Sequence, residues 1–444
     1  MNTFPPKLPW TELFVRSGLK TLSDRVRQRS MVRRVRGAVD DLRSTVRNAA
    51  RQRLPQASAA AGWMVQRLLE GAAVGPSAIV NATGIIAPRG YSLPLAEAAI
   101  ASMHAASEGF STATSALEPL LIDLTGAEAA LVLHSPSAAC LAVLSALGGP
   151  VVVARSHVGE ADDVALCNLA ALAGTRLTEI GSVGRVSCVD YRAALKAGDQ
   201  ACVWHSQPQS IAVLGEVAAP SAEEVFAIAR EHGCPAIEYL EAATLVELST
   251  GGNSVSIPIA RASLLAGADL VVLPGDRFIG GPSCGIIVGR SKLVARVAAH
   301  VLARSSALDS GRLAALVATL ELMGDRARLT SIPTYQLLCA TSENLQHRAD
   351  RLVAQLSDCS LVTAAEAVPC PGFLNDGRLK TQQFAGWGVA ITATEPSEMF
   401  AKKRLESPPR VAVLQEDGRL IFNLRSVLAG QDAQLAAVFQ GKSD

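Results

Sequence analysis

The stretch LVVLPGDRFIGGPSCGIIVGR, residues 270–290, holds two short apolar runs on either side of a glycine-rich turn. Each run has the length of a fully buried strand, and the connection is too short for a helical crossover, so the second strand is predicted to run antiparallel to the first. Gly280 and Gly281 lie in this turn, where glycine permits tight backbone conformations. Arg277 follows Asp276 in the same turn, and its role is the question that the stretch raises.

Short apolar runs alternate with helical segments on the N-terminal side of this stretch. The runs cover residues 130–134, 151–154, 202–205, 235–240 and 270–275. Between them lie segments with helical patterns, one of which (residues 221–232) opens with the Ser-x-x-Glu pattern of a capping box. Strands that alternate with helices predict an α/β domain with a mostly parallel, doubly wound sheet.

The chain becomes less regular after about residue 330, and it ends in a predicted hairpin, RVAVLQEDGRLIFNLRSV. With 444 residues, 49% of them apolar, the chain is long enough for two or three domains. We therefore expect a helical N-terminal domain over residues 1–75, a large α/β domain over residues 76–330 and a small α+β domain over residues 331–444.

The N-terminal part carries the one clear charge asymmetry. Residues 10–54 repeat apolar positions at helical spacing and place many arginines around them, among which Arg33, Arg34 and Arg36 are candidate RNA-binding residues. Two interpretations stay open: a solvated helix face, or a contact with RNA or another phosphate-bearing partner. The net charge is only +1, so any such binding is expected to be local.

The nine cysteines are scattered and contain no CxxC pair, which argues against a disulfide framework and against a zinc cluster. The sequence shows neither a secretory signal nor an apolar segment long enough to cross a bilayer. We therefore expect a cytoplasmic protein with no metal site and no membrane partner.

Six strings of this sequence resemble the bacterial selenocysteine synthase family, the L-seryl-tRNA(Sec) selenium transferases, in the family's order. They are NATGII (81–86), LTGAEAA (124–130), HS (205–206), GD (275–276), GGP (280–282) with GIIVG (285–289), and EDGRL (416–420) with LR (424–425). The start of the chain, LPWTELF followed by VRGAVDDLRSTVR, is similar to the family's N-terminal helical domain. The resemblance implies the fold type I scaffold of pyridoxal phosphate-dependent transferases, with NATGII as the opening strand of the large domain, and a homo-oligomer built from dimers.

The resemblance also implies a lysine that binds pyridoxal phosphate as an imine, and it places that lysine at position 277. Arg277 offers a planar, delocalised guanidinium that stays protonated and has no free amine for an imine. The lysine nearest in sequence, Lys292, lies beyond a whole further strand. No covalently bound cofactor is expected; attachment through another lysine is the alternative.

A carboxylate should contact the pyridine nitrogen of the cofactor. An ungapped alignment of residues 235–248 with the family puts Tyr239 at this position, and a phenol with a pKa of about 10 is a poor partner for a pyridinium. Glu238 is expected on the opposite face of the strand, because side chains alternate, and Glu241 lies past the strand end. A bulge that reorients either carboxylate is the alternative.

Other anion donors of the family are also missing. Where members carry an Asn-Leu-Gly-Arg loop, this chain reads APRGYS, residues 87–92, and Arg89 is the one candidate replacement. The remnants of the site are expected to be Arg277, Asp276 and His205, with Tyr239, Gly280 and Gly281 lining the pocket. A structural interpretation stands beside each: the glycines shape a turn, Asp276 caps it, and His205 ends a strand.

The sequence thus predicts a selenium transferase-like protein that is catalytically degenerate, a pseudoenzyme that acts in binding or regulation. Its expected partners are a tRNA, an active homologue, or further copies of the chain. The first alternative is an active transferase or lyase of the same superfamily that binds pyridoxal phosphate or another small anionic ligand without a covalent bond. The second is a purely structural scaffold.

Overall fold

The computed structural model describes residues 78–109, 116–161, 164–195, 201–206, 217–248, 257–376, 383–406 and 409–439. Residues Ile79–Gly441 form one unit. The predicted N-terminal helical domain, with Arg33, Arg34 and Arg36, lies outside the described residues.

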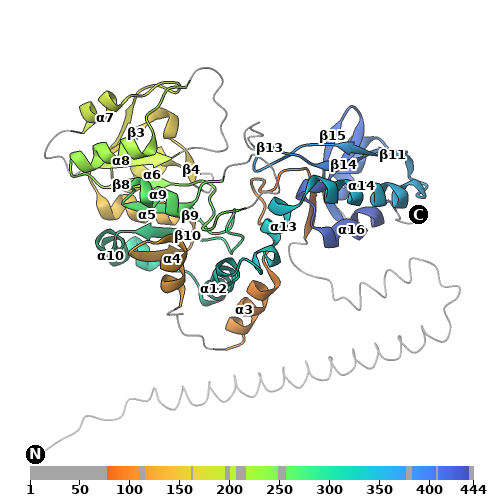
Figure 1. The fold of residues 1–444 in the computed structure, drawn as a ribbon, viewed down its shortest axis with the longest axis horizontal. Helices are drawn as coiled ribbons and strands as arrows, with labels where there is room; N and C mark the ends of the chain where they lie inside the picture. Colours follow the sequence, from red (N-terminus) through yellow and green to blue (C-terminus); the bar gives the residue numbers. More distant parts are fainter. Residues whose placement is uncertain are drawn as a thin grey trace, which may run out of the picture. The chain divides into compact units, whose positions relative to one another are not determined.

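A seven-stranded sheet forms the centre of the larger part of this unit (Figure 1). Its strands are β2 (Ala129–Leu133), β3 (Val151–Ala154), β6 (Leu177–Ile180), β7 (Cys202–Ser206), β8 (Ala236–Tyr239), β9 (Leu270–Pro274) and β10 (Gly285–Gly289). They lie in the order β2-β10-β9-β8-β7-β3-β6, and only β10 runs antiparallel to its neighbours. The mostly parallel sheet and the antiparallel strand after the glycine turn are both confirmed.

Helices cover both faces of this sheet. The helices of this part are α3 (Glu97–Ser107), α4 (Leu117–Thr125), α5 (Pro136–Leu147), α6 (Leu166–Leu172), α7 (Cys188–Ala194), α8 (Ala222–Glu231), α9 (Ala260–Ala266), α10 (Ser291–Ala299), α11 (Val301–Ser305), α12 (Ser310–Gly324) and α13 (Pro333–Cys339). Helix α8 begins with the predicted capping box, in which Ser221 and Glu224 each bond the backbone amide of the other.

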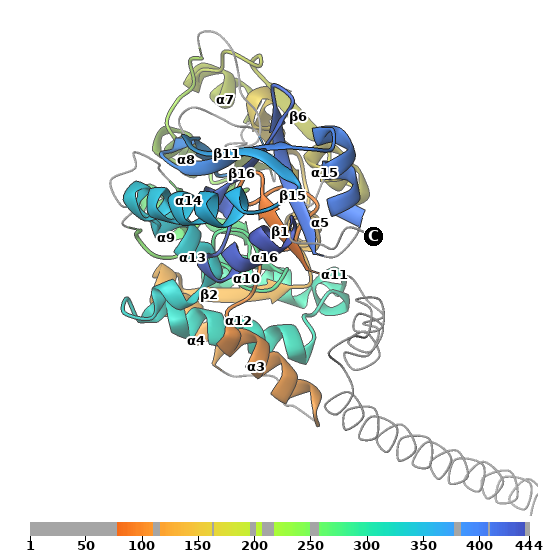
Figure 2. The ribbon, with the colours of Figure 1, turned by 90° about the vertical axis from the view of Figure 1, so that its right-hand side faces the viewer.

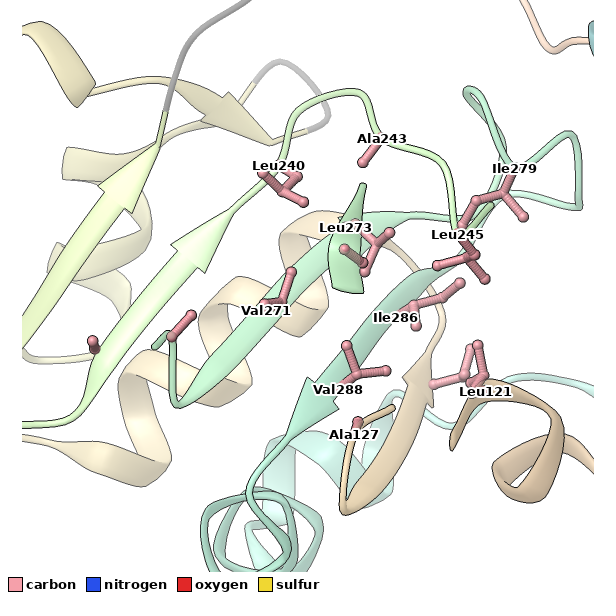
Figure 3. Close-up of a cluster of buried hydrophobic side chains, with 14 of the residues drawn as sticks. Leu121, Ala127, Leu240, Ala243, Leu245, Val271, Leu273, Ile279, Ile286 and Val288 are labelled. Carbon is pink, nitrogen blue, oxygen red and sulfur yellow. The ribbon is translucent and has the colours of Figure 1, made fainter. Parts of the chain in front are cut away.

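The alternation of side chains along the strands produces two cores. One core joins the sheet to α4, α8 and α12, and Figure 3 shows Val271 and Leu273 of β9 in it, with Leu121 of α4 nearby. The other core joins the opposite face to α5, α6 and α10. Adjacent residues of one strand therefore lie in different surroundings.

A second sheet has the order β1-β15-β16-β14-β11. Its strands are β1 (Ile79–Ala82), β11 (Val362–Pro369), β14 (Trp387–Ala393), β15 (Arg410–Glu416) and β16 (Arg419–Asn423), and its helices are α14 (Ser342–Ser357), α15 (Ser397–Glu406) and α16 (Asp432–Ala437). Two short pairs, β4 (Glu160–Ala161) with β5 (Val164–Ala165) and β12 (Gly372–Phe373) with β13 (Gln383–Phe384), complete the strands. Figure 2 shows β1 beside β15.

One prediction about this sheet is wrong and one is confirmed. The strand of NATGII, β1, does not open the large sheet but pairs in parallel with β15, because its alternating burial suits a half-buried edge position. The division at residue 330 therefore does not separate the two sheets. The hairpin β15-β16 is confirmed: Glu416 lies opposite Arg419, and Asp417 and Gly418 take the positive φ values of 49° and 74° that a two-residue turn requires. Within the described ranges, no helix is long and apolar enough to cross a membrane.

Candidate functional site

Arg277 lies in the turn after β9 and is half-buried. Its Nη1 donates to the carbonyl oxygen of Ala87 at 3.2 Å and lies 3.5 Å from the carbonyl oxygen of Pro88. A narrow cleft of about 20 Å³ adjoins the guanidinium, and its lining residues are Ala87, Arg89, Glu241, Ala242, Arg277, Phe278, Asn375 and Asp376. The residue at the expected imine position therefore holds a main-chain segment of its own chain.

Arg89, the expected replacement for a lost anion donor, is engaged with acidic side chains. Its Nη1 lies 3.0 Å from Oε2 of Glu160 and its Nη2 lies 4.0 Å from Oε1 of Glu241. The backbone amide of Arg89 donates to Oδ2 of Asp376 at 2.6 Å. These three carboxylates offset the charges of Arg89 and Arg277, so the cleft does not carry a large positive field.

Tyr239 lies on the α5 and α6 face of β8 and does not line the Arg277 cleft. Its ring stacks on Trp204 of β7, with 6.2 Å between ring centres and 29° between ring planes. Beside it is a cavity of about 10 Å³, which Cys140 and Ser206 also line. Ligand pockets usually measure about 300 to 1,000 Å³, so the space at Tyr239 is far too small for a cofactor-sized molecule.

Glu238 and His205 point to the other face of the sheet, which confirms the predicted alternation with Tyr239. Nδ1 of His205 lies 3.0 Å from Oε1 of Glu238, and both side chains are buried. The ring of His157 meets that of His205 edge-on, with 4.6 Å between centres. Burial, and then the neighbouring His205, lower the pKa of His157 to about 3. His205 thus lies in the protein interior and not in the cleft of Arg277.

The two glycines of the turn are required by packing. At Gly280, φ is +73°, and a side-chain carbon there would lie 2.5 Å from Cγ2 of Ile332. At Gly281 such an atom would lie 3.1 Å from Cδ1 of Leu316. Both glycines face protein atoms at these distances, so the structural interpretation accounts for them without a ligand.

Asp276 precedes Arg277 and acts on a neighbour. Burial, and then the charge of Asp276, raise the pKa of the Cys284 thiol, which is fully buried. That cysteine is therefore a poor nucleophile.

Sequence analysis missed Glu160, Asn375 and Asp376 as neighbours of the turn. Glu160 and Asp376 reach it through Arg89, from which they are 71 and 287 positions away in the chain. No local pattern marks such partners.

Comparisons with known proteins agree with this architecture. A family model described as L-seryl-tRNA selenium transferase matches residues 99–428. The L-seryl-tRNA(Sec) selenium transferase of Moorella thermoacetica is 30% identical over 94% of this chain and 92% of its own length. That of Hyphomonas neptunium is 30% identical over 82% of both chains. The solved D-glucosaminate-6-phosphate ammonia-lyase covers 82% of this chain and 95% of its own, with a TM-score of 0.60 and 16% identity, which is a likeness of fold alone. The predicted class, fold type I of the pyridoxal phosphate-dependent transferases, is confirmed.

Proposed function

This chain belongs to the L-seryl-tRNA selenium transferase family. We propose that it keeps the fold of this pyridoxal phosphate-dependent family but not the imine chemistry, and that it acts in binding or regulation. In this proposal the protein is a pseudoenzyme. It is neither a transferase nor a lyase, and its role depends on what it holds.

The observation that carries this proposal is the state of Arg277. A bound cofactor of this kind supplies an electron sink for bonds to the substrate's α-carbon, and it needs a neutral amine as its anchor. A guanidinium, which stays protonated and has its charge delocalised over three nitrogens, supplies none. The side chain is also occupied, because its Nη1 donates to the carbonyl oxygen of Ala87.

The surroundings of Tyr239 support the same proposal. A pyridine nitrogen needs a carboxylate partner, whereas the position carries a phenol packed on Trp204. The nearest carboxylate in sequence, Glu238, is committed to His205 on the far face of the sheet. The residues present at the two positions therefore do not fit covalently bound pyridoxal phosphate.

Trapping the imine tests the proposal. Purified full-length protein is incubated with pyridoxal phosphate, reduced with borohydride and weighed by intact mass spectrometry. We expect no adduct and no absorbance band of a protonated imine. An adduct on any lysine would reject the proposal, and peptide mapping would identify the residue.

Two variants of the same protein probe the pocket. R277K restores the amine alone, and we expect no selenium transfer from it, because Tyr239 still occupies the position of the carboxylate. R277K/Y239D restores both groups and serves as the matched comparison. Transfer activity in R277K alone would mean that the pocket is more intact than proposed.

A second candidate function is non-covalent binding of a small anion at Arg277. Among the described residues Arg277 makes no ion pair within 4.0 Å, and a guanidinium fork matches a phosphate or carboxylate. Titration calorimetry with pyridoxal phosphate and with inorganic phosphate distinguishes the two candidates. Binding that R277M abolishes, and that R155M at an exposed ion pair leaves intact, would favour anion binding.

We propose RNA and further copies of the chain as partners. The arginine-rich residues 10–54 would bind phosphates, so affinity for a tRNA should fall steeply with salt and with R33E/R34E/R36E. Sedimentation of the purified protein should show an assembly built from dimers. If neither salt nor the charge reversal changed the affinity for a tRNA, the proposal that these arginines bind RNA would be rejected.

A further inference from the structure

Residues 84–89, here called the strap, connect the second sheet to the large one. The strap follows β1 directly. On one side its backbone pairs with the segment that contains β12: Phe373 donates to Gly84 at 2.8 Å, Ile86 donates to Phe373 at 2.8 Å, and Ala87 donates to Leu374 at 2.9 Å. On this side the strap therefore pairs with residues 373–374, which lie between β11 and β14 of the second sheet in the chain.

The other side of the strap is held by side chains from segments that follow strands of the large sheet. Arg277 comes after β9 and bonds the carbonyl oxygen of Ala87. Glu241 comes after β8, Glu160 comes after β3, and both lie against the guanidinium of Arg89. Asp376 adds a bond to the Arg89 amide from the β12 side.

Arg277 has a distinct part in this arrangement. The ion pairs of Arg89 join exposed or partly exposed side chains, with 43% of both Arg89 and Glu160 exposed, so water and salt weaken them. Arg277 is half-buried and bonds the main chain, and its bond does not depend on the rotamer of a second long side chain. It is thus the contact best suited to fix the backbone of the strap.

We propose that Arg277 is a clamp that holds the strap against the turn after β9. Because the strap also pairs with the segment around β12, the clamp fixes residues 372–376 to the large sheet. The site that gives relatives their chemistry serves here to restrict motion between two sheets. This role does not depend on whether a cofactor or anion binds elsewhere in the protein.

Hydrogen exchange of the full-length protein, without added ligand, tests the clamp. In R277M the methionine fills similar space but donates no hydrogen bond, so the strap should open more often. We expect the amides of Ile86, Ala87, Arg89 and Phe373 to exchange about tenfold faster, the factor that corresponds to one lost charge-assisted hydrogen bond.

A second variant and a control make the result specific. D376A removes the acceptor of the Arg89 amide and should speed exchange in the same peptides through a different contact. R155M breaks the exposed pair of Arg155 with Glu179 and should leave these peptides unchanged. Faster exchange in R277M that is confined to residues 275–282, with residues 84–89 and 372–376 unchanged, would overturn the clamp.

Discussion

Two arginines of this protein, one beside each sheet, donate to main-chain carbonyl oxygens and differ in how the chain surrounds them. Arg277 is half-buried and bonds Ala87. Arg425, after β16, is fully buried; its Nη1 donates to Leu337 at 3.3 Å and to Ala340 at 2.6 Å, and its Nη2 donates to Ala385. Burial, and then the charge of Arg348, lower the pKa of Arg425 to about 10, which leaves it charged at neutral pH.

The two arginines differ in how closely the surrounding chain encloses them. Gly372 and Gly386 leave room for the Arg425 side chain, and the ring of Phe384 faces its guanidinium at 5.5 Å. Arg277 is instead half-buried and lines a narrow cleft. Arg425 is thus enclosed by its own chain, whereas Arg277 stays partly exposed.

The largest effect should come from R425M. It leaves a fully buried site without its charge and the carbonyl oxygens of Leu337, Ala340 and Ala385 without their donor, which should lower the free energy of unfolding by about 4 kcal/mol. Urea unfolding measures this loss. R419M, which breaks a pair of exposed side chains with Glu366, should cost less than about 1 kcal/mol. Equal losses in R425M and R419M would mean that the burial of Arg425 does not add to its contribution to stability.

A smaller loss of stability should follow from reducing the space around the Arg425 side chain. In G372A the new methyl group would lie 2.1 Å from Cγ of Arg425, so the side chain must shift, at a cost of roughly 2 kcal/mol in unfolding free energy. G430A is the control, since no atom lies within 4 Å of a side-chain carbon there. If G372A unfolds at the same urea concentration as G430A, Gly372 is not needed to make room for Arg425.

A third prediction concerns His157, a buried base that, in the described part of the chain, lacks the hydrogen-bond partners that surround Arg425, and the effect of pH on stability. His157 is buried, its Nδ1 has no hydrogen-bond partner among the described residues, and its pKa of about 3 keeps it neutral. The unfolded chain takes up a proton below about pH 6.5 and the folded protein does not, so stability falls as pH falls through this range. From about pH 6.5 to pH 5 the loss should be about 1.5 kcal/mol.

Urea unfolding across this range tests the sign. H157Q should flatten the pH dependence, because no imidazole remains to take up a proton on unfolding. H104Q, at a side chain that is 74% exposed, should not change it. A pH dependence that stays the same in H157Q would place the acid sensitivity in other groups.

The sequence predicted the central strands of the large sheet well, because strands buried on both faces appear as continuous apolar runs such as VVVA in β3. It missed β6, whose residues are half-buried or exposed at the sheet edge and show no apolar run. The family resemblance placed the strand of NATGII in the large domain, but its partner strand in the structure begins only at Arg410. Local patterns report burial, but they do not report which distant strand a segment joins.

The contacts of the candidate site could not be predicted from the sequence. The loss of the imine and of the pyridinium partner stays a prediction from the identities of residues 277 and 239. The opposite orientations of Glu238 and Tyr239 followed from strand alternation. The bond from Arg277 to Ala87 spans 190 positions and depends on how two sheets meet, so no pattern in the sequence announces it.

The pairing of β1 with β15 has a consequence for how the polypeptide is made. Ile79 leaves the ribosome tens of seconds before Arg410, its partner, has been synthesised. Throughout that interval the early strand lacks the neighbour that satisfies its backbone, and the second sheet cannot close until the strand that begins at Arg410 has emerged. The nascent chain therefore has to keep an unpaired strand from aggregating for the whole of that time.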